Sequence, residues 1–206
     1  MIIHALNNFV VERARTARRF ISQTKPPYSI SDLTILELDK QNENISEEIL
    51  ALFRTKVSFG LISESGMPAI ADPGAKIVAL AHKHGYEVKP LVGPSSLFLA
   101  LAASGMNGQN FCFNGYLPIK DGELSSVLKD LEKKVIQQKQ TQIFIETPYR
   151  NNRLVRAILK VINPQLNLCI AIDITGSQEN ITTKSIKEWK KKTPALEKTP
   201  TIFLLG

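Results

Sequence analysis

Cysteine, histidine and tryptophan are scarce in this sequence, which limits the side-chain chemistry that it can carry. The 206 residues include 2 cysteines, 3 histidines and 1 tryptophan. Cys112 and Cys169 each lie in an apolar run, and neither has neighbours at the spacing of metal ligands. We therefore predict no metal site and no disulfide framework, and we expect two reduced thiols, as in a cytoplasmic protein.

The sequence also lacks an apolar run long enough to cross a membrane. The longest one, "LVGPSSLFLALAASGM" at residues 91–106, contains one proline and three serines. It is shorter than the roughly 20 apolar residues that a spanning helix needs. No secretory signal is visible at the N-terminus. We expect a cytoplasmic protein with no membrane contact.

Common catalytic and phosphate-binding patterns are missing as well. His4, His82 and His84 lie outside the loops that end the predicted strands, so no Ser–His–Asp arrangement is expected. The glycine-rich cradle that binds phosphates is absent. These absences favour a reaction that depends on the orientation of its substrates more than on strong acid–base groups.

What the sequence does contain is an ordinary globular composition with an excess of positive charge. Hydrophobic residues make up 43% and charged residues 22% of the chain, as in a folded protein with a buried core. The net charge of +7 favours a polyanionic partner such as a nucleic acid. The charge gathers in two clusters, Arg13, Arg15, Arg18 and Arg19 near the N-terminus and Lys187, Lys190, Lys191 and Lys192 near the C-terminus. A solvated helix face explains such clusters at least as often as binding does.

Segments with the periods of strands and helices alternate along the first half of the chain. The predicted strands lie at residues 9–11, 33–38, 57–62 and 86–91. The predicted helices lie at residues 13–24, 46–53, 75–84 and 97–103. The apolar stripe of the first helix comprises Ala14, Ala17, Phe20 and Ile21. This alternation indicates an α/β domain with a largely parallel sheet.

The pattern changes after "GMNGQN", where we predict a domain boundary at residues 107–109. Further strands are predicted at residues 111–118, 141–146, 168–174 and 199–206, with helices at 124–139 and 153–162. We therefore predict two α/β domains, an N-terminal one at residues 1–108 and a C-terminal one at residues 109–206.

Four loops at predicted strand ends are rich in glycine, proline and small hydroxyl residues. They are residues 63–74, 93–96, 146–150 and 173–177. In open α/β sheets, ligands bind outside the carboxyl ends of the strands. Backbone amides, hydroxyls and apolar walls suit a ligand with an adenosine and an amino-acid tail.

Four motifs in colinear order carry a resemblance to a known family. They are "SESGMPAIADPG" at residues 63–74, "VGPS" at 92–95, "FNGYLP" at 113–118 and "FIETPYR" at 144–150. With them the sequence resembles the tetrapyrrole methylase superfamily, the class III S-adenosylmethionine-dependent methyltransferases. Within it, the chain is most similar to the small-subunit ribosomal RNA methyltransferase I branch, which methylates a ribose 2′-hydroxyl of a cytidine in 16S ribosomal RNA.

The resemblance implies two α/β domains with the cofactor in a cleft between them, usually in a homodimer. It implies S-adenosylmethionine as the cofactor, with ribosomal RNA or the small ribosomal subunit as partner. The residues implied to bind the cofactor are Ser65, Gly66, Met67, Ile70, Ser95, Ser96, Glu146, Ile174 and Thr201. Ser95 and Ser96 would contact its methionyl part, Glu146 the adenosine and Ile174 the adenine.

The sequence departs from the family pattern in three places. The family begins with a further strand and a Gly/Pro loop, so we expect an incomplete first sheet here. Its A-E-D-T-R motif stands as "VERAR" at residues 11–15, which keeps Glu12 and Arg15. Its R-E-L-T-K motif stands as "IDITG" at residues 172–176, which loses both basic residues. We therefore expect weak or no methyl transfer by the chain as given.

Three functions stay open at this point. The leading hypothesis is 2′-O-ribose methylation of ribosomal RNA, in which the arginine cluster binds RNA and Glu12 takes the hydroxyl proton. On spacing alone, Glu12 is better explained as a surface carboxylate that is stabilised at a helix N-terminus by the helix dipole. The alternatives are methylation of a small tetrapyrrole, or a non-catalytic module that binds S-adenosylmethionine and acts through protein contacts.

Overall fold

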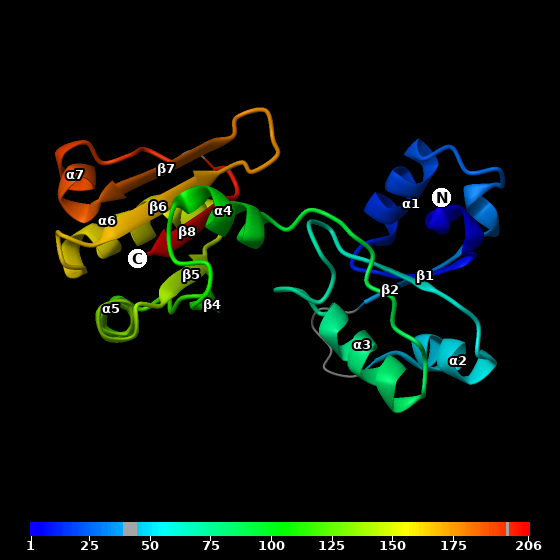
Figure 1. Cartoon of the computed structure of the whole chain (residues 1–206). Helices are drawn as coiled ribbons and strands as arrows, with labels where there is room; N and C mark the ends of the chain where they lie inside the picture. The colour runs from blue at the N-terminus through cyan, green and yellow to red at the C-terminus, as the bar shows by residue number, and fades with distance from the viewer. Residues whose placement is uncertain (39–44, 197) are drawn as a thin grey trace. The chain divides into compact units, whose positions relative to one another are not determined.

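The predicted α/β fold is confirmed, and its strands form two separate sheets (Figure 1). The structure is a computed structural model that describes residues 1–38, 45–196 and 198–206. The chain divides into two units, Met1–Pro94 and Ser95–Gly206. This division precedes the predicted boundary at residues 107–109, because helix α4 (Ser96–Ser104) packs on the sheet of the second unit.

The sheet of the first unit is entirely parallel. Strand β1 (Asn8–Val11) lies between β2 (Thr34–Glu37) and β3 (Gly60–Ile62). Val11 pairs with Glu37 on one side and with Ile62 on the other. All three strands therefore end at the same edge, which is where a ligand site is expected in such a sheet.

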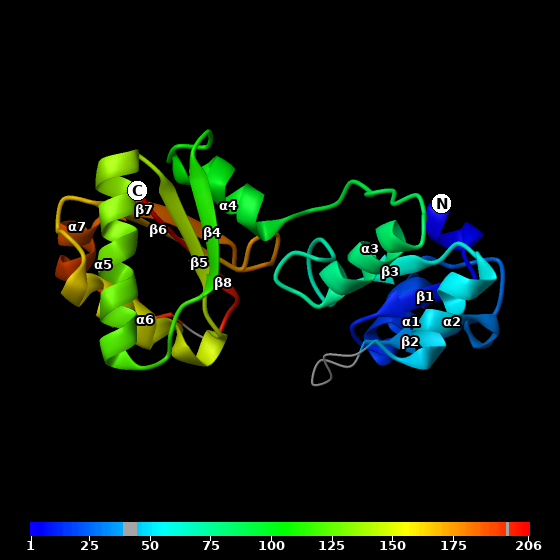
Figure 2. The same cartoon turned by 90° about the horizontal axis from the view of Figure 1, so that it is seen from below.

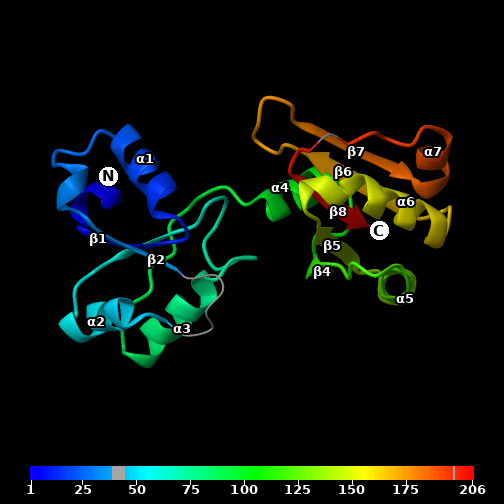
Figure 3. The same cartoon turned by 180° about the vertical axis from the view of Figure 1, so that it is seen from behind.

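Helices cover both faces of this sheet (Figure 3). Helices α1 (Ala14–Gln23) and η2 (Ile30–Asp32) cover the face of Phe9 and Val11. Helices α2 (Glu47–Thr55) and α3 (Gly74–Lys83) cover the face of Val10. The two faces alternate because successive strand residues point in opposite directions. A short 3-10 helix, η1 (Ile2–Ala5), precedes β1.

Local signals in the sequence correctly mark several helix ends. The Ser46 hydroxyl accepts a hydrogen bond from the Ile49 amide at 3.4 Å and caps α2. Gly85 follows α3 with a φ of +71°, a conformation that stops helices and favours glycine. The stripe of α1 buries Ala17 and Ile21, whereas Phe20 was predicted there and is 50% exposed.

The prediction of a strand at residues 86–91 is wrong. This segment forms no strand in the structure, and β3 is shorter than the predicted strand at residues 57–62. A strand needs a partner for its backbone hydrogen bonds, and β3 has none beyond β1 among the described residues. Leu91 and Val92 are correspondingly exposed.

The second unit contains a mixed five-stranded sheet of order β4-β5-β8-β6-β7. Its strands are β4 (Phe111–Tyr116), β5 (Thr141–Ile145), β6 (Asn167–Ile172), β7 (Asn180–Ser185) and β8 (Thr201–Leu205). Strands β4, β5 and β6 run in one direction, and β7 and β8 run in the other.

Helices also cover both faces of this sheet (Figure 2). Three helices, α5 (Asp121–Gln138), α6 (Asn151–Val161) and α7 (Ile186–Lys191), bury the larger apolar cluster on one face. Helix α4 covers the other face, where Ala100 and Leu101 meet Leu204. A further 3-10 helix, η3 (Pro148–Arg150), precedes α6.

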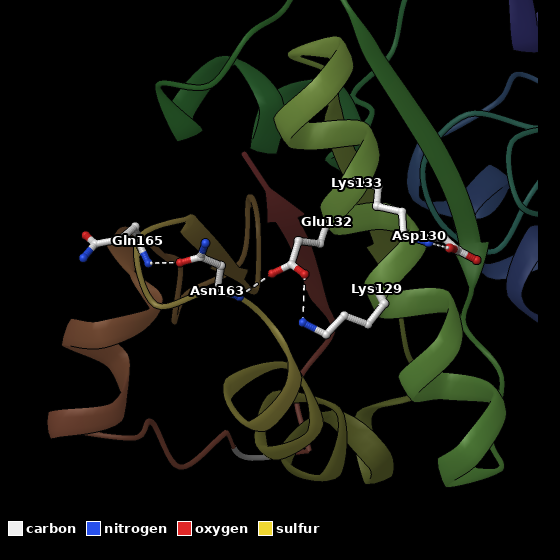
Figure 4. A network of polar contacts seen from close by, with 6 residues as sticks. All are labelled: Lys129, Asp130, Glu132, Lys133, Asn163 and Gln165. Atoms are coloured by element: carbon white, nitrogen blue, oxygen red, sulfur yellow. Dashed lines mark hydrogen bonds and ion pairs between the residues drawn. The ribbon is translucent and has the colours of Figure 1, made fainter.

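A polar network joins α5 to the turn between α6 and β6 (Figure 4). The largely buried Glu132 carboxylate accepts hydrogen bonds from the Asn163 amide at 2.5 Å and from Lys129 Nζ at 2.8 Å. Asn163 Oδ1 accepts from the Gln165 amide at 2.9 Å. Lys133 and Asp130 form a separate exposed pair at 3.0 Å. The network fixes the start of β6, the strand that leads to one of the predicted site loops.

None of the helices in the described part of the chain combines the length and the apolar character that crossing a bilayer requires.

Candidate functional site

The loop at residues 63–74 leaves β3 at the carboxyl edge of the first sheet and has a strained backbone. Gly66, Ala69 and Ala71 have φ values of +71°, +69° and +60°. The left-handed conformation is unfavourable for alanine, because its Cβ crowds the following carbonyl. Strained backbone of this kind is concentrated at binding sites, where surrounding contacts hold it in place.

Asp72 holds the strained turn together. Its Oδ1 accepts hydrogen bonds from the amides of Ala69 and Gly74, both at 2.7 Å. A Cβ at position 74 would lie 2.9 Å from Asp72 Oδ1, so only glycine fits without displacement. Asp72 Oδ2 is buried and has no hydrogen-bond partner among the described residues. Asp72 was not predicted as a site residue, although the sequence "DPG" could have indicated an Asx-type turn.

The tip of this loop is open to solvent. Ser65 and Gly66 are exposed, Met67 is half-buried, and Ile70 is 43% exposed. A Cβ built at Gly66 would meet only the Pro94 carbonyl, at 3.9 Å. The structure therefore brings the predicted loop at residues 65–67 beside the end of the "VGP" segment.

Two serines follow that segment. Ser95 is buried, and Ser96 is exposed at the first position of α4. Met106 lies just beyond the end of α4, and Gly206 follows β8. The two are close together, because a Cβ built on Gly206 would lie 2.9 Å from Met106 Sδ. Helix α4 therefore ends near the end of β8, on the sheet of the second unit.

Glu12 follows β1 at the same edge as the strained loop. Its Oε2 accepts a hydrogen bond from the Glu64 amide at 2.7 Å. The Glu64 side chain in turn accepts from Thr16 Oγ1 at 3.3 Å and pairs with Arg13 at 4.0 Å. These contacts tie the start of the loop to the start of α1. They give Glu12 an anchoring role, and its role in catalysis stays a prediction.

In the second unit, Glu146 leaves the carboxyl end of β5. Its Oε1 accepts from Arg150 Nη2 at 2.7 Å, from Arg150 Nε at 3.0 Å and from the Thr147 amide at 2.5 Å. The Glu146 side chain is 7% exposed and that of Arg150 is 32% exposed. The pair fixes the turn from β5 into η3. The predicted contact of Glu146 with adenosine stays a prediction.

Thr201 is buried at the start of β8, beside the ends of β5 and β6. Its hydroxyl donates to the Thr199 carbonyl at 3.0 Å and accepts from Asn151 Nδ2 at 3.2 Å. Asn151 is fully buried, and its Oδ1 has no partner among the described residues. Sequence reasoning missed Asn151, although it occupies the apolar stripe of α6 together with Leu154, Val155 and Ile158.

The loop after β6 is a compact turn stabilised by its own carboxylates. Asp173 and Thr175 have φ values of +49° and +66°. Asp173 Oδ2 accepts from the Gln178 amide at 2.9 Å, and Glu179 Oε2 accepts from the Thr175 amide at 2.6 Å. Ile174 packs against the apolar cluster under α4. This turn places Ile174 at the same edge of the sheet as Glu146 and Thr201.

The four predicted RNA-binding arginines are all exposed. Arg13 precedes α1, and Arg15, Arg18 and Arg19 lie on it. Apart from the Arg13–Glu64 pair, none of the four has an ion pair within the described ranges. The structure therefore leaves three neighbouring guanidinium groups available to an anion.

Metal and thiol chemistry find no support in the described residues. No group of three or more potential metal-ligating side chains occurs there. Burial raises the pKa of the Cys169 thiol, so it stays protonated at neutral pH. Cys112 is partly buried, and both cysteines are free thiols.

Comparison with known proteins agrees with this architecture. The family model described as tetrapyrrole (corrin/porphyrin) methylases matches residues 8–190. Two curated relatives are named ribosomal RNA small subunit methyltransferase I. The one from Buchnera aphidicola subsp. Baizongia pistaciae is 28% identical over 82% of this chain and 58% of its own. The one from Thermotoga maritima is 31% identical over 76% of this chain and 69% of its own.

Solved structures of methyltransferases share the fold. The match to the methyltransferase CobJ covers 98% of this chain and 83% of the CobJ chain, with a TM-score of 0.62 and 17% sequence identity. A second match is to uroporphyrin-III C-methyl transferase from Thermus thermophilus, complexed with S-adenyl homocysteine. It covers 99% of this chain and 87% of that chain, with a TM-score of 0.55 and 16% sequence identity. The chain spans somewhat under two thirds of the length of the first curated relatives that it matches, 58% and 60%.

Proposed function

The chain belongs to the family of tetrapyrrole (corrin/porphyrin) methylases, and from this premise we propose that it is an S-adenosylmethionine-dependent methyltransferase. We propose a ribose 2′-hydroxyl of small-subunit ribosomal RNA as its acceptor, a homodimer as its working form and the cytoplasm as its location. The names of the curated relatives support an RNA acceptor. The bound S-adenyl homocysteine named for one structural neighbour supports the cofactor.

The strained loop at residues 63–74 is the observation that carries this proposal. Two alanines are held in the left-handed conformation by Asp72, while the tip at Ser65 and Gly66 stays open. Such a preformed backbone surface suits the adenosine and amino-acid parts of S-adenosylmethionine. The proposed cofactor residues are those predicted, Ser65, Gly66, Met67, Ile70, Ser95, Ser96, Glu146, Ile174 and Thr201. Of these, Glu146 would act by holding its loop in place through Arg150.

When bound, S-adenosylmethionine supplies a methyl group activated by a sulfonium. The task of the chain is then to align the attacking oxygen with that methyl, because alignment supplies much of the acceleration in such a transfer. The open tip of the loop, at Ser65 and Gly66, would orient the cofactor through its backbone groups. Glu12, at the base of the loop, is the proposed acceptor of the hydroxyl proton.

The test combines cofactor binding with methyl transfer. Calorimetry with S-adenosylhomocysteine should give a saturable heat. A tritiated-methyl assay should label RNA in small-subunit particles isolated from cells that lack the corresponding modification. Label in a porphyrinogen acceptor and none in RNA would replace the proposed acceptor by a tetrapyrrole. Binding without transfer to either acceptor would leave only a cofactor-binding module.

A further inference from the structure

Tyr149 and Lys198 form an exposed pair of an aromatic ring and a cation in the second unit. Tyr149 is 77% exposed, more than any other Phe, Tyr or Trp in the described ranges. The Lys198 ammonium lies over its ring, 5.0 Å from the ring centroid. A ring that has a cation beside it and is largely open to solvent offers a partner both an apolar face and a positive charge.

Both residues lie at the edge of the second sheet where a ligand is expected. Tyr149 lies in η3, just after the end of β5 at Ile145, and Lys198 lies just before the start of β8 at Thr201. Ile145 pairs with Ile202 in the antiparallel β5–β8 ladder, so the end of β5 and the start of β8 meet at one edge. The carboxyl ends of parallel strands are the usual place for a ligand in α/β sheets.

Hydrogen bonds on both sides of Lys198 hold its segment against the start of α6. Asn151 Nδ2 donates to the Thr199 carbonyl at 3.0 Å, and Asn152 Nδ2 donates to the Leu196 carbonyl at 2.6 Å. The Leu196 amide donates back to Asn152 Oδ1 at 2.8 Å. Because η3 directly precedes α6, these bonds bring the ammonium and the ring together before any ligand binds. Such preorganisation lowers the entropic cost of binding.

A second ring–cation pair shows the same contact in a structural role. Lys184 Nζ lies 4.9 Å from the centroid of the Trp189 ring. Trp189 is 6% exposed, belongs to the larger apolar cluster and donates its indole N–H to the Leu168 carbonyl at 2.8 Å. Tyr149 belongs to none of the apolar clusters of the described residues. Packing therefore accounts for the ring of Trp189 but not for the ring of Tyr149.

The charge of Lys198 has no counter-charge among the described residues. Lys198 is exposed and forms no ion pair within them. The carboxylate of Glu146, at the end of β5, is bound to Arg150 at 2.7 Å. The carboxylate of Asp121 is bound to Arg153, in the first turn of α6, at 2.5 Å. The Lys198 ammonium is therefore available to an anion.

Single-stranded RNA matches both features of this pair. Its unpaired bases stack on aromatic side chains, and its phosphates bind cations. A duplex keeps its bases stacked inside the helix, and an acidic peptide has no base to stack. We propose that Tyr149 stacks on an unpaired base of single-stranded RNA while Lys198 binds a phosphate of the same strand. This inference rests on the proposed ribosomal RNA acceptor, and it adds a contact in the second unit to the one predicted for the arginines of α1.

Fluorescence anisotropy with a labelled 12-nucleotide single-stranded RNA tests the two contacts separately. Tyr149→Leu removes the ring and should weaken binding about tenfold, since each stacked base contributes at that level. Its salt dependence should match that of the parent chain, because no phosphate contact is lost. Tyr149→Phe keeps the ring and should bind nearly as tightly as the parent chain. Lys198→Met should instead reduce the slope of log affinity against log salt by about 0.7, the contribution of one phosphate of a single strand.

Two matched controls accompany these variants. Lys184→Met removes a cation that lies over the buried ring of Trp189, at the opposite edge of the sheet, and should leave the salt dependence unchanged. A duplex of the same sequence should bind the parent chain and Tyr149→Leu equally, because its bases are not free to stack. Thermal melting verifies that every variant folds, and the exposed Tyr149 can be replaced without disturbing the core.

A gain-of-signal variant supplies an independent readout. Tyr149→Trp retains an aromatic ring and should bind as tightly as the parent chain. Its fluorescence should be quenched by the single-stranded RNA and not by the same strand made with abasic sites. The native Trp189 gives little background change, because its indole is buried and hydrogen-bonded.

Four results would overturn the inference. They are no RNA binding by the parent chain, equal affinity of Tyr149→Leu and the parent chain, equal losses for single strand and duplex, and equal slope changes for Lys184→Met and Lys198→Met. These outcomes are separate from the fate of the proposed function. A parent chain that binds RNA through Tyr149 but transfers no methyl group supports the inference and contradicts the function. A parent chain that labels RNA while Tyr149→Leu binds normally does the reverse.

Discussion

The two units hold their strand-end loops in different ways. In the first unit, the loop at residues 63–74 is shaped by its backbone, with Ala69 and Ala71 held in the left-handed conformation by Asp72. In the second unit, side chains pair with one another, as Glu146 does with Arg150. The first arrangement leaves a backbone surface open at Ser65 and Gly66, whereas the second consumes its polar groups internally.

This difference distinguishes residues that can bind a ligand from residues that stabilise the fold. Polar groups that are already paired within the protein have little left to offer a ligand, and removing one partner leaves the other unsatisfied. We therefore expect substitutions in the first loop to reduce cofactor affinity more than stability. Substitutions in the paired side chains of the second unit, Glu146 and Arg150, should reduce stability more than cofactor affinity.

The largest effect is expected at the open tip of the first loop. Gly66→Val should reduce affinity for S-adenosylhomocysteine on the order of 100-fold, since the new side chain occupies the space offered to the ligand and strains a backbone of φ +71°. Isothermal titration calorimetry measures the affinity, and thermal melting measures the stability.

Gly85→Val is the matched control for this prediction. Gly85 has the same φ of +71° and open space around its Cβ, but it lies after α3, away from the loop. Both variants should lose stability by a similar 1–3 kcal/mol, roughly the cost of such strain. If Gly85→Val loses cofactor affinity as well, strain anywhere in the first unit is sufficient and the loop has no special role.

The second-largest effect is expected at Asp72, whose carboxylate holds the loop in its conformation. Asp72→Ala removes the acceptor of two backbone amides, so Ala69 and Ala71 should relax out of the left-handed conformation. We expect about a tenfold loss of affinity in calorimetry, since one such hydrogen bond contributes about 1 kcal/mol. Asp72→Asn keeps an oxygen at the Oδ1 position and should bind nearly as well as the parent chain. Equal losses for both variants would contradict a purely hydrogen-bonding role.

Local chemistry accounts for much of what the sequence predicts correctly. The cap at Ser46, the helix stop at Gly85 and the alternation of strands and helices depend on residues close together in the chain. The loop at residues 63–74 is recognisable for the same reason, because its glycines and prolines demand unusual backbone conformations. These signals were sufficient to predict the α/β fold.

Tertiary pairing explains what could not be predicted. Strand β7 has the polar sequence "NITTKS", which shows no strand periodicity, and it forms because β6 supplies its hydrogen bonds. The segment "YEVKPL" at residues 86–91 forms no strand, because no strand among the described residues pairs with it. Asn151 likewise acquires its role from Thr199 and Thr201, about 50 residues away. None of these partners is visible locally in the sequence.

A smaller effect is expected from breaking the Glu146–Arg150 ion pair of the second unit. It should reduce mainly stability, whereas the substitutions in the first loop should reduce mainly cofactor affinity. Glu146→Gln should lower the free energy of unfolding by about 1–2 kcal/mol, a value reduced from that of a fully buried pair because Arg150 is 32% exposed. Cofactor affinity should change less than in Asp72→Ala. Denaturant unfolding followed by the fluorescence of Trp189, which lies in the second unit, isolates the relevant transition.

A double-mutant cycle separates the two possible uses of Glu146. If the carboxylate acts through Arg150, then Glu146→Gln and Arg150→Met should not be additive in stability. A large loss of affinity in Glu146→Gln with unchanged stability would instead identify a direct contact with the cofactor. That result would break the contrast between the two units.

The smallest effect is a pH dependence at the surface of the second unit. Hydrogen bonds from the Ser185 hydroxyl and amide hold the pKa of Glu188 below its ordinary value, and Lys184 and Lys191 act in the same direction. A carboxyl whose pKa is lower in the folded state contributes stability above its unfolded pKa and loses it as the pH falls through the folded one. Between pH 5 and pH 3, roughly the range over which carboxyls titrate, Glu188→Gln should therefore lose less stability than the parent chain, as measured by Trp189 fluorescence. Glu123→Gln removes an exposed carboxylate from the start of α5 and controls for net charge. Identical pH profiles for the parent chain and Glu188→Gln would mean that solvent screening cancels the capping contribution of this exposed carboxylate.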